Sequence, residues 1–166
     1  MTRRVTLAIL VTAWFCVGSV RAQDGVEFVG TFGSWDVRTA QTPDGQICAA
    51  RALHPEIRFG DIFWAYNTAL ADSQPVGYLA IDPRLLSSGD DARATIDGEA
   101  SFSLSRAADG YAYSEPDDDE RLFTLMREGL VMIVRLGGNG AEDEIEVSLL
   151  GFTLATNAAL AACNAS

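Results

Sequence analysis

The fold class follows from residues 92–105, whose sequence is ARATIDGEASFSLS. Phe102 and Leu104 alternate with Ser101, Ser103 and Ser105, so the apolar and polar side chains point to opposite faces of an extended chain. The dipeptide Asp97-Gly98 separates this run from the shorter run at 92–96 and is typical of a tight turn. The stretch therefore predicts an antiparallel hairpin with one buried face.

Similar patterns lie on both sides of this hairpin. Thr42-Pro43-Asp44-Gly45 is a strong turn signal between two extended segments. The run at 130–136 is continuously apolar, which favours a central strand. Together these patterns predict strands at 26–31, 35–39, 46–53, 61–71, 76–81, 130–136 and 144–150. The Gly-rich segment 137–140 is interpreted as a hairpin turn, since no helix start or Lys follows it.

Two segments have helical patterns instead. The first begins at Ser114-Glu115-Pro116, with Ser114 as the cap, acidic residues in the first turn, and Gly129 as the stop. The second is the Ala-rich segment that ends at Ala162, where Leu154, Ala158 and Ala161 are expected to form one face. The sequence predicts about eight strands with two short helices, mainly β, as an antiparallel β-sandwich or a partly closed barrel.

The N-terminus has the three parts of a secretory signal. Arg3 and Arg4 precede an apolar run at 5–20, and Val20-Arg21-Ala22 offers small residues for a peptidase. An uncleaved membrane anchor is the competing interpretation, but the run is shorter than the ~20 residues that span a bilayer. We expect a signal peptide at 1–22, a single β-rich domain at 23–166, and a periplasmic or secreted location without a membrane span.

The mature chain is strongly acidic. Residues 1–22 contain three of the 12 basic residues and no acid, so cleavage changes the formal charge from −11 to −14. All of the basic residues are Arg, and they are scattered. Such a surface repels phosphate and anionic lipid, which argues against nucleic-acid or membrane-surface binding.

Cys48 and Cys163 are the cysteines that remain after cleavage, because Cys16 lies in the signal. In an oxidising compartment a disulfide between them is the simplest prediction. Two free thiols or an intermolecular bridge are the alternatives. The chain has no C-x-x-C, so a redox-active pair is not expected.

Several motifs resemble the invasion-associated locus B family of bacterial exported proteins. They are Phe32-Gly33-Ser34-Trp35-Asp36-Val37, Cys48 after a turn, Ile96-Asp97-Gly98 followed by Phe102, the stretch 122–136, and the ending Val147-Ser148-Leu149-Leu150-Gly151-Phe152-Thr153. The resemblance implies a divergent member, because Thr39 stands where many members have Cys. It further implies a secreted or periplasmic all-β domain with no known catalytic activity.

Candidate catalytic and metal-binding residues are few. His54, the single histidine, precedes Pro55 and has no evident partners for a triad or a metal site. The run Asp117–Glu120 is contiguous, unlike the spaced ligands of a calcium loop, and is interpreted as a solvated helix start. Carboxylates for glycoside hydrolysis could come from Asp82, Asp90, Asp91 and Asp97, but their spacing singles out no pair. We expect no cofactor and no metal.

The aromatic segment around Trp64 offers a candidate interaction surface. Trp64 and Tyr66 share one face of a strand and Phe63 takes the other. The pattern favours core packing, and the alternative is an open patch for a partner or a glycan.

Two functions follow from these observations. The first is an exported, non-enzymatic, envelope-associated or interaction domain with an unknown protein or envelope partner. The second is a small hydrolase that uses acidic residues on envelope glycans.

Peptide mapping without reduction tests the disulfide. We expect a linked peptide that contains Cys48 and Cys163, because the exported chain retains these two thiols in an oxidising compartment. Recovery of two alkylatable thiols from the exported protein would contradict the pairing.

Overall fold

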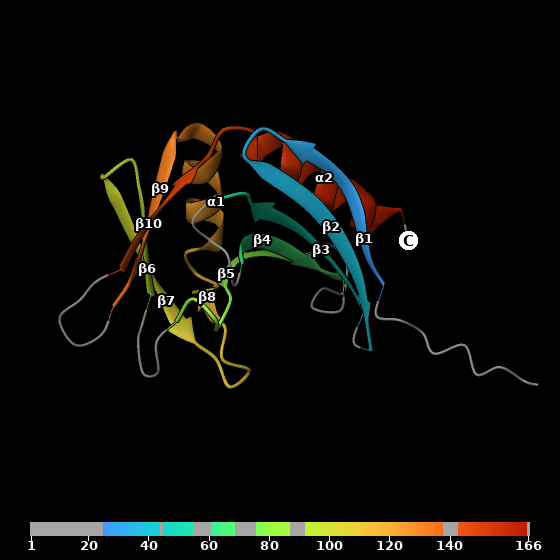
Figure 1. The fold of residues 1–166 in the computed structure, drawn as a ribbon, viewed down its shortest axis with the longest axis horizontal. Coiled ribbons are helices and arrows are strands. Elements are labelled where there is room, and N and C mark those ends of the chain that lie inside the picture. Colours follow the sequence, from blue (N-terminus) through green and yellow to red (C-terminus); the bar gives the residue numbers. More distant parts are fainter. Residues whose placement is uncertain are drawn as a thin grey trace, which may run out of the picture.

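The computed structural model describes residues 25–43, 45–54, 61–68, 76–86, 92–137 and 143–165, so the predicted signal at 1–22 lies outside them. Within these residues, ten strands form one antiparallel sheet in the order β1-β2-β3-β4-β5-β8-β7-β6-β9-β10. The sheet curls into a half-barrel around two helices (Figure 1). The mainly β prediction is confirmed, and of the two predicted arrangements the partly closed barrel is the one observed.

The first five strands make one side of the half-barrel. They are β1 (Val26–Phe32), β2 (Trp35–Thr42), β3 (Gly45–Ala52), β4 (Ile62–Asn67) and β5 (Val76–Ile81). The other side contains β6 (Ala92–Ile96), β7 (Ala100–Arg106), β8 (Ala112–Ser114), β9 (Val131–Leu136) and β10 (Asp143–Ser148). Strand β8 was not predicted, because three residues are too short to show an alternation.

The hairpin at 92–105 forms as predicted. Strands β6 and β7 pair from Ala92↔Leu104 to Ile96↔Ala100. Asp97 and Gly98 both adopt positive φ, 49° and 74°, which tight hairpin turns require. Phe102 and Leu104 are buried while the alternating serines are exposed.

Helix α2 (Phe152–Asn164) packs across β1 to β4 on the inner face of the sheet (Figure 1). Its buried face consists of Phe152, Ala155, Thr156, Ala159 and Cys163, at helical spacing. The predicted face is wrong, because Leu154 and Ala161 are exposed. The Sγ atoms of Cys48 on β3 and Cys163 lie 2.07 Å apart, so a disulfide holds this face against the sheet.

Helix α1 (Asp119–Glu128) lies in the concavity near β5. Leu122 and Met126 are fully buried, and the helix ends at Gly129 as predicted. Its start differs from the prediction. Asp118 is the N-cap, whereas Ser114 ends β8 and donates a hydrogen bond to the Asp119 carboxylate instead of capping the helix. Neither helix in the described parts of the chain has the length and hydrophobicity to cross a bilayer.

Two glycine turns bring distant parts of the sheet together. A Cβ at Gly33 would lie 2.5 Å from the Leu150 carbonyl oxygen, and a Cβ at Gly151 would lie 2.1 Å from the Phe32 carbonyl oxygen. Both glycines have positive φ, a conformation that other residues rarely adopt. The β1–β2 turn and the β10–α2 turn therefore meet backbone to backbone.

Hydrogen bonds join the same two turns. The Ser34 amide donates to the Leu150 carbonyl at 2.9 Å, and Trp35 Nε1 donates to the Ser148 carbonyl at 2.9 Å across 113 residues. The Trp35 ring contacts Phe152 edge-on at 5.0 Å. The two stretches that carry the family resemblance, 32–37 and 147–153, are thus the two sides of one contact.

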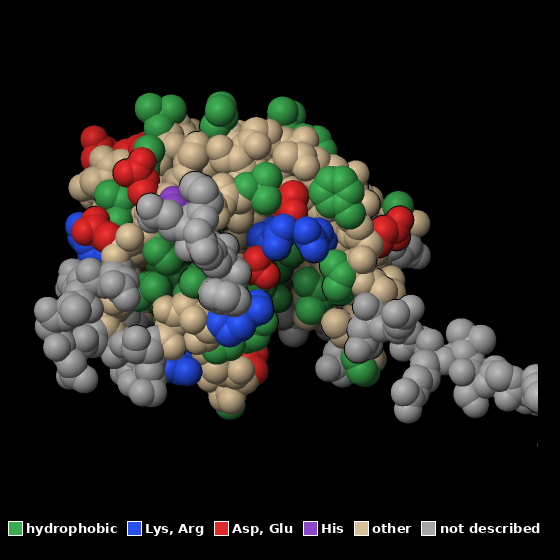
Figure 2. All heavy atoms as spheres, viewed as in Figure 1, with side chains coloured by type: hydrophobic (Ala, Val, Ile, Leu, Met, Phe, Trp, Pro, Cys, Tyr) green, Lys and Arg blue, Asp and Glu red, His purple; other side chains and the backbone are tan. Residues whose placement is uncertain are grey.

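Exposed leucines surround this contact. Leu130, Leu150 and Leu154 are 76%, 71% and 63% exposed. Figure 2 shows hydrophobic side chains standing out along the upper edge, where Figure 1 places the β10–α2 turn. At Leu150 the main-chain carbonyl makes the contact with Ser34, while the side chain is exposed.

Replacing Trp35 by Phe tests the contact between the turns. We expect Trp35→Phe to lower the free energy of unfolding by about 1–3 kcal/mol more than Trp64→Phe, because only the first removes a buried hydrogen bond. Urea unfolding of the two variants measures the difference. Equal losses would show that the Trp35 bond contributes nothing.

Candidate binding site

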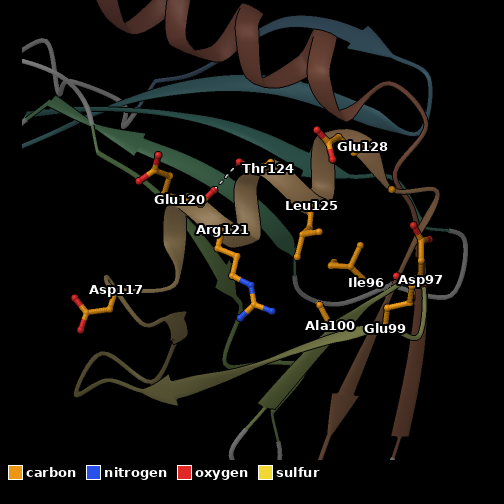
Figure 3. Close-up of a pocket in the computed structure, with 11 residues that line it drawn as sticks. Ile96, Asp97, Glu99, Ala100, Asp117, Glu120, Arg121, Thr124, Leu125 and Glu128 are labelled. Carbon is orange, nitrogen blue, oxygen red and sulfur yellow. Dashed lines mark hydrogen bonds between the residues drawn. The ribbon is translucent and has the colours of Figure 1, made fainter.

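A groove of about 680 Å³ lies between α1 and the β6–β7 hairpin (Figure 3). Ile96 and Ala100 from the hairpin and Leu125 from the helix provide its apolar surface. Carboxylates stand around it: Asp97 and Glu99 from the hairpin, and Asp117, Glu120 and Glu128 from α1 and the segment before it. Its size is within the range of ligand sites, ~300–1,000 Å³.

The helical repeat places the residues of the α1 wall. Arg121, Leu125 and Glu128 are spaced by four and three residues, so they follow one side of the helix and border the groove. Leu122 and Met126 lie on the buried side, which fixes the rotation of the helix. Packing of the core thus determines which polar side chains reach the groove.

Asp97 already has a structural role. Its carboxylate accepts hydrogen bonds from the backbone amides of Leu130, at 3.1 Å, and Val131, at 2.9 Å. The bonds tie the hairpin turn to the segment that joins α1 and β9. Asp97 therefore holds the wall of the groove in place, and its carboxylate is not free to act as a catalytic acid.

Arg121 is the cation among the residues lining the groove. Its guanidinium carbon lies 5.4 Å from the centroid of the Phe102 ring, a cation–π contact. Figure 3 shows the Arg121 side chain extending from the helix toward the strands, with Glu120 and Glu128 on other sides of the opening. One positive charge among five carboxylates leaves the groove negative.

A second, smaller hollow of about 280 Å³ lies on the other side of α1. It is lined by Trp64, Tyr66, Gly77, Pro116, Asp119, Glu120 and Phe123. Glu120 lines both hollows. The start of α1 therefore separates two neighbouring recesses and contributes an acidic side chain to each.

Trp64 and Tyr66 do not form the open surface that was one interpretation of the sequence. They are 2% and 6% exposed, so the favoured interpretation, core packing, is the one observed, and the alternative of an open interaction surface at these two residues is wrong. Trp64 stacks on Phe123 of α1 at 4.9 Å and meets Phe152 of α2 edge-on. Both helices cover this face of β4, which the sequence of β4 alone could not show.

Asp119 is the buried acid beside the small hollow. Burial raises its pKa, Asp118 and Glu115 raise it further, and the hydrogen bond from Ser114 acts in the opposite direction. The members of the acidic run differ in role, because Asp119 is bonded to Ser114 and Asp117 borders the groove.

The other predicted candidates do not converge on a site. His54 is half-buried in the connection after β3, and Asp90 and Asp91 lie outside the described residues. Asp82 is held by Arg84 through two side-chain bonds, at 2.8 and 2.6 Å, and these lower its pKa. The described residues contain no group of His, Cys, Asp or Glu that could hold a metal ion.

An ion-pair cluster that was not predicted lies near Asp82. Arg51 donates to Asp36 at 3.0 and 2.6 Å and to Asp61 at 3.1 Å, which raises the pKa of Arg51. Basic and acidic side chains lie side by side near the middle of the face in Figure 2. The cluster pairs β2 with β3 and satisfies the buried Asp36, so its role is structural.

Comparisons with known proteins give a likeness in structure and none in sequence. No family model and no curated protein sequence matches the chain. Among solved structures, it is similar to the crystal structure of invasion associated protein B from Bartonella henselae, with a TM-score of 0.57. The match covers 84% of this chain and 97% of that chain at 16% identity. The two proteins share a fold. At this identity the likeness assigns no function or residue role to the chain.

The raised pKa of Asp119 predicts a pH effect on stability. The folded state holds this proton more tightly than the unfolded state. Ionisation of Asp119 therefore lowers the free energy of unfolding, and this loss develops as pH rises from about 3.8 through the raised pKa. We expect Asp119→Asn, which keeps an acceptor for Ser114, to raise the melting temperature at pH 7.

The gain should vanish below pH 3.8, where Asp119 is protonated in both states. Thermal unfolding of the two proteins from pH 3 to 8 measures it, and Glu146→Gln on exposed β10 is the control. A difference between wild type and Asp119→Asn that does not change with pH would contradict the assignment.

Proposed function

We propose that the chain is an exported, envelope-associated, non-enzymatic domain that binds a positively charged protein through the groove between α1 and the β6–β7 hairpin. One observation carries the proposal: five carboxylates and one Arg surround an apolar floor of suitable size. The apolar floor offers contact area, and the acidic walls select a cationic surface. The formal charge of −11 for the whole chain strengthens the attraction at longer range.

Two further observations support the location and the absence of catalysis. The Cys48–Cys163 bond suits an extracellular or periplasmic compartment. The structural neighbour is named for association with invasion and carries no enzyme name. A divergent relationship to that protein is part of the proposal.

The runner-up is a glycan hydrolase, since acids from α1 face acids from the hairpin across the groove. Such an enzyme needs a general acid with a raised pKa. Asp119, whose pKa is raised, is instead engaged by Ser114 beside the small hollow. A zymogram on cell-wall glycan should show no cleared band. Turnover that Glu99→Gln and Glu128→Gln abolish would establish the hydrolase instead.

Carbodiimide crosslinking tests the binding function. The reagent joins carboxylates to amines, and this chain contains no Lys, so any crosslink to a lysine side chain identifies another protein. In envelope extracts we expect lysine crosslinks concentrated at Glu99, Glu120 and Glu128. Glu128→Gln should lower the yield, while Glu146→Gln on β10 should leave it unchanged.

An even spread of crosslinks over exposed acids, including Glu27 and Glu146, would contradict the groove as the binding surface. So would the same yield from Glu128→Gln as from Glu146→Gln.

A further inference from the structure

Three exposed leucines begin where the groove ends. Leu130, Leu150 and Leu154, here called the leucine patch, are the most exposed large hydrophobic side chains of the described residues. Leu130 directly follows Gly129, which lines the groove. The Leu130 amide also donates to the carboxylate of Asp97, another lining residue, at 3.1 Å. The apolar patch and the acidic groove are therefore neighbouring parts of one surface.

Hydrogen bonds hold the segments that carry the patch together. The Leu149 amide donates to the Leu130 carbonyl at 2.9 Å, which joins the start of β9 to the residue before Leu150. The Thr153 hydroxyl donates to the Arg127 carbonyl at 3.4 Å, which joins the first turn of α2 to the last turn of α1. The leucines are thus presented on a fixed backbone, so a partner that covers them orders little more than side chains.

The grouping of these leucines distinguishes them from ordinary surface residues. Single exposed apolar side chains are common, whereas groups of them mark contact sites. Figure 2 shows hydrophobic side chains projecting along the upper edge, where Figure 1 places the β10–α2 turn. The side chains project from the surface, so a partner must cover them from outside.

The end of the groove beside the patch is acidic. Figure 3 shows Glu128 on the last turn of α1, on the same side of the opening as Asp97 and Glu99 of the hairpin. The guanidinium of Arg127, the neighbour of Glu128, lies instead 5.6 Å from the ring of Phe123, which lines the small hollow on the other side of α1. Negative charge therefore lies next to exposed leucines.

This combination of charge and exposed apolar surface selects the occupant. An anionic lipid surface would be repelled by the acids beside the patch. A second copy of the chain, packed patch against patch, would bring two sets of the same acids together. A basic protein with an apolar side chain next to its cations is complementary to both parts, because its cations offset the acids while the leucines gain cover.

We propose that the leucine patch and the acidic groove form one continuous docking surface for a basic segment of another protein that carries large apolar side chains at one end. The inference rests on the proposed function and specifies its partner. Cations of the segment lie in the groove near Glu128, and its apolar end covers Leu130 and Leu150. The acids select the partner by charge, and the leucines add contact area that salt does not screen.

Nuclear magnetic resonance with designed peptides tests the docking surface. The probe is a blocked peptide of Arg, Ser, Arg, Ser, Leu and Phe, made in both sequence orders. In one control Ser replaces Leu and Phe, and in the other Gln replaces both Arg residues. We expect the probe to move the amides of Leu125 and Gly129 in the groove and the methyl groups of Leu130 and Leu150 in the patch. Either control should bind at least fivefold more weakly.

Substitution of Leu130 tests the apolar contact. Leu130→Ser should raise the Kd of the probe about threefold to tenfold, because part of a leucine side chain loses its cover. The loss should be the same in low salt and in about 0.5 M salt. Val26→Ser, which removes an exposed apolar side chain at the far end of β1, is the matched control and should leave the Kd unchanged. Equal urea midpoints of the two variants would show that both are folded.

Substitution of Glu128 tests the charged contact. Glu128→Gln should raise the Kd about twofold to fivefold in low salt, and the effect should shrink in about 0.5 M salt. An unchanged Kd in Leu130→Ser, or equal binding of the probe and the peptide without Leu and Phe, would overturn the proposal.

The outcomes separate this inference from the proposed function. If the groove amides move and Glu128→Gln weakens binding while the leucine methyl groups are still, the groove stands and the patch is not part of it. If the methyl groups move and the groove amides are still, the patch binds without the groove and the proposed function is wrong. If neither set moves, both are wrong.

Two further measurements test the other occupants. We expect no binding to phosphatidylcholine vesicles and a monomer mass at every concentration in sedimentation equilibrium. Vesicle binding that Leu130→Ser abolishes would make a lipid surface the occupant. A dimer that Leu130→Ser dissociates would make a second copy the occupant. Either result would overturn the proposal.

Discussion

The backbone contact between the Gly33 turn and the Gly151 turn is the constraint on which the rest of the structure depends. A curled sheet can close only if segments far apart in the chain meet, and here the atoms approach too closely for any Cβ at either glycine. The Trp35 indole and the Ser34 amide each donate a hydrogen bond across this contact. The contact fixes the start of β2, the end of β10 and the first residue of α2 at once.

The helices and the candidate site follow from this closure. Phe152 directly follows the Gly151 turn and packs on Trp35, so α2 leaves the contact already directed across β1 to β4, and the Cys48–Cys163 bond holds its other end. Helix α1 fills the remaining concavity through Leu122 and Met126. Because α1 cannot rotate, its Glu120 and Glu128 are presented at the groove while Phe123 covers Trp64.

Local features were predictable from the sequence, and contacts between distant segments were not. The β6–β7 hairpin follows from strict alternation and Asp97-Gly98, and the end of α1 follows from Gly129. The face of α2 was assigned wrongly because Phe152 and Cys163, whose partners lie on β2 and β3, set its rotation. The sequence predicts Ser114 as a cap, because the bond from the Leu79 amide on β5 to the Ser114 hydroxyl has no sequence signal. The groove could not be predicted from the sequence, because it joins acids of α1 to acids of a hairpin that lies about 20 to 30 residues earlier in the chain.

Native-state hydrogen exchange at the two turns tests the central claim most directly. If their contact holds the half-barrel closed, the Ser34 amide and the Trp35 indole N–H exchange only on global unfolding, with the same opening free energy as the amides of β3 and β4. Exchange of these two groups through a local opening of much lower free energy, while β3 and β4 stay protected, would show that the sheet keeps its curl without the contact.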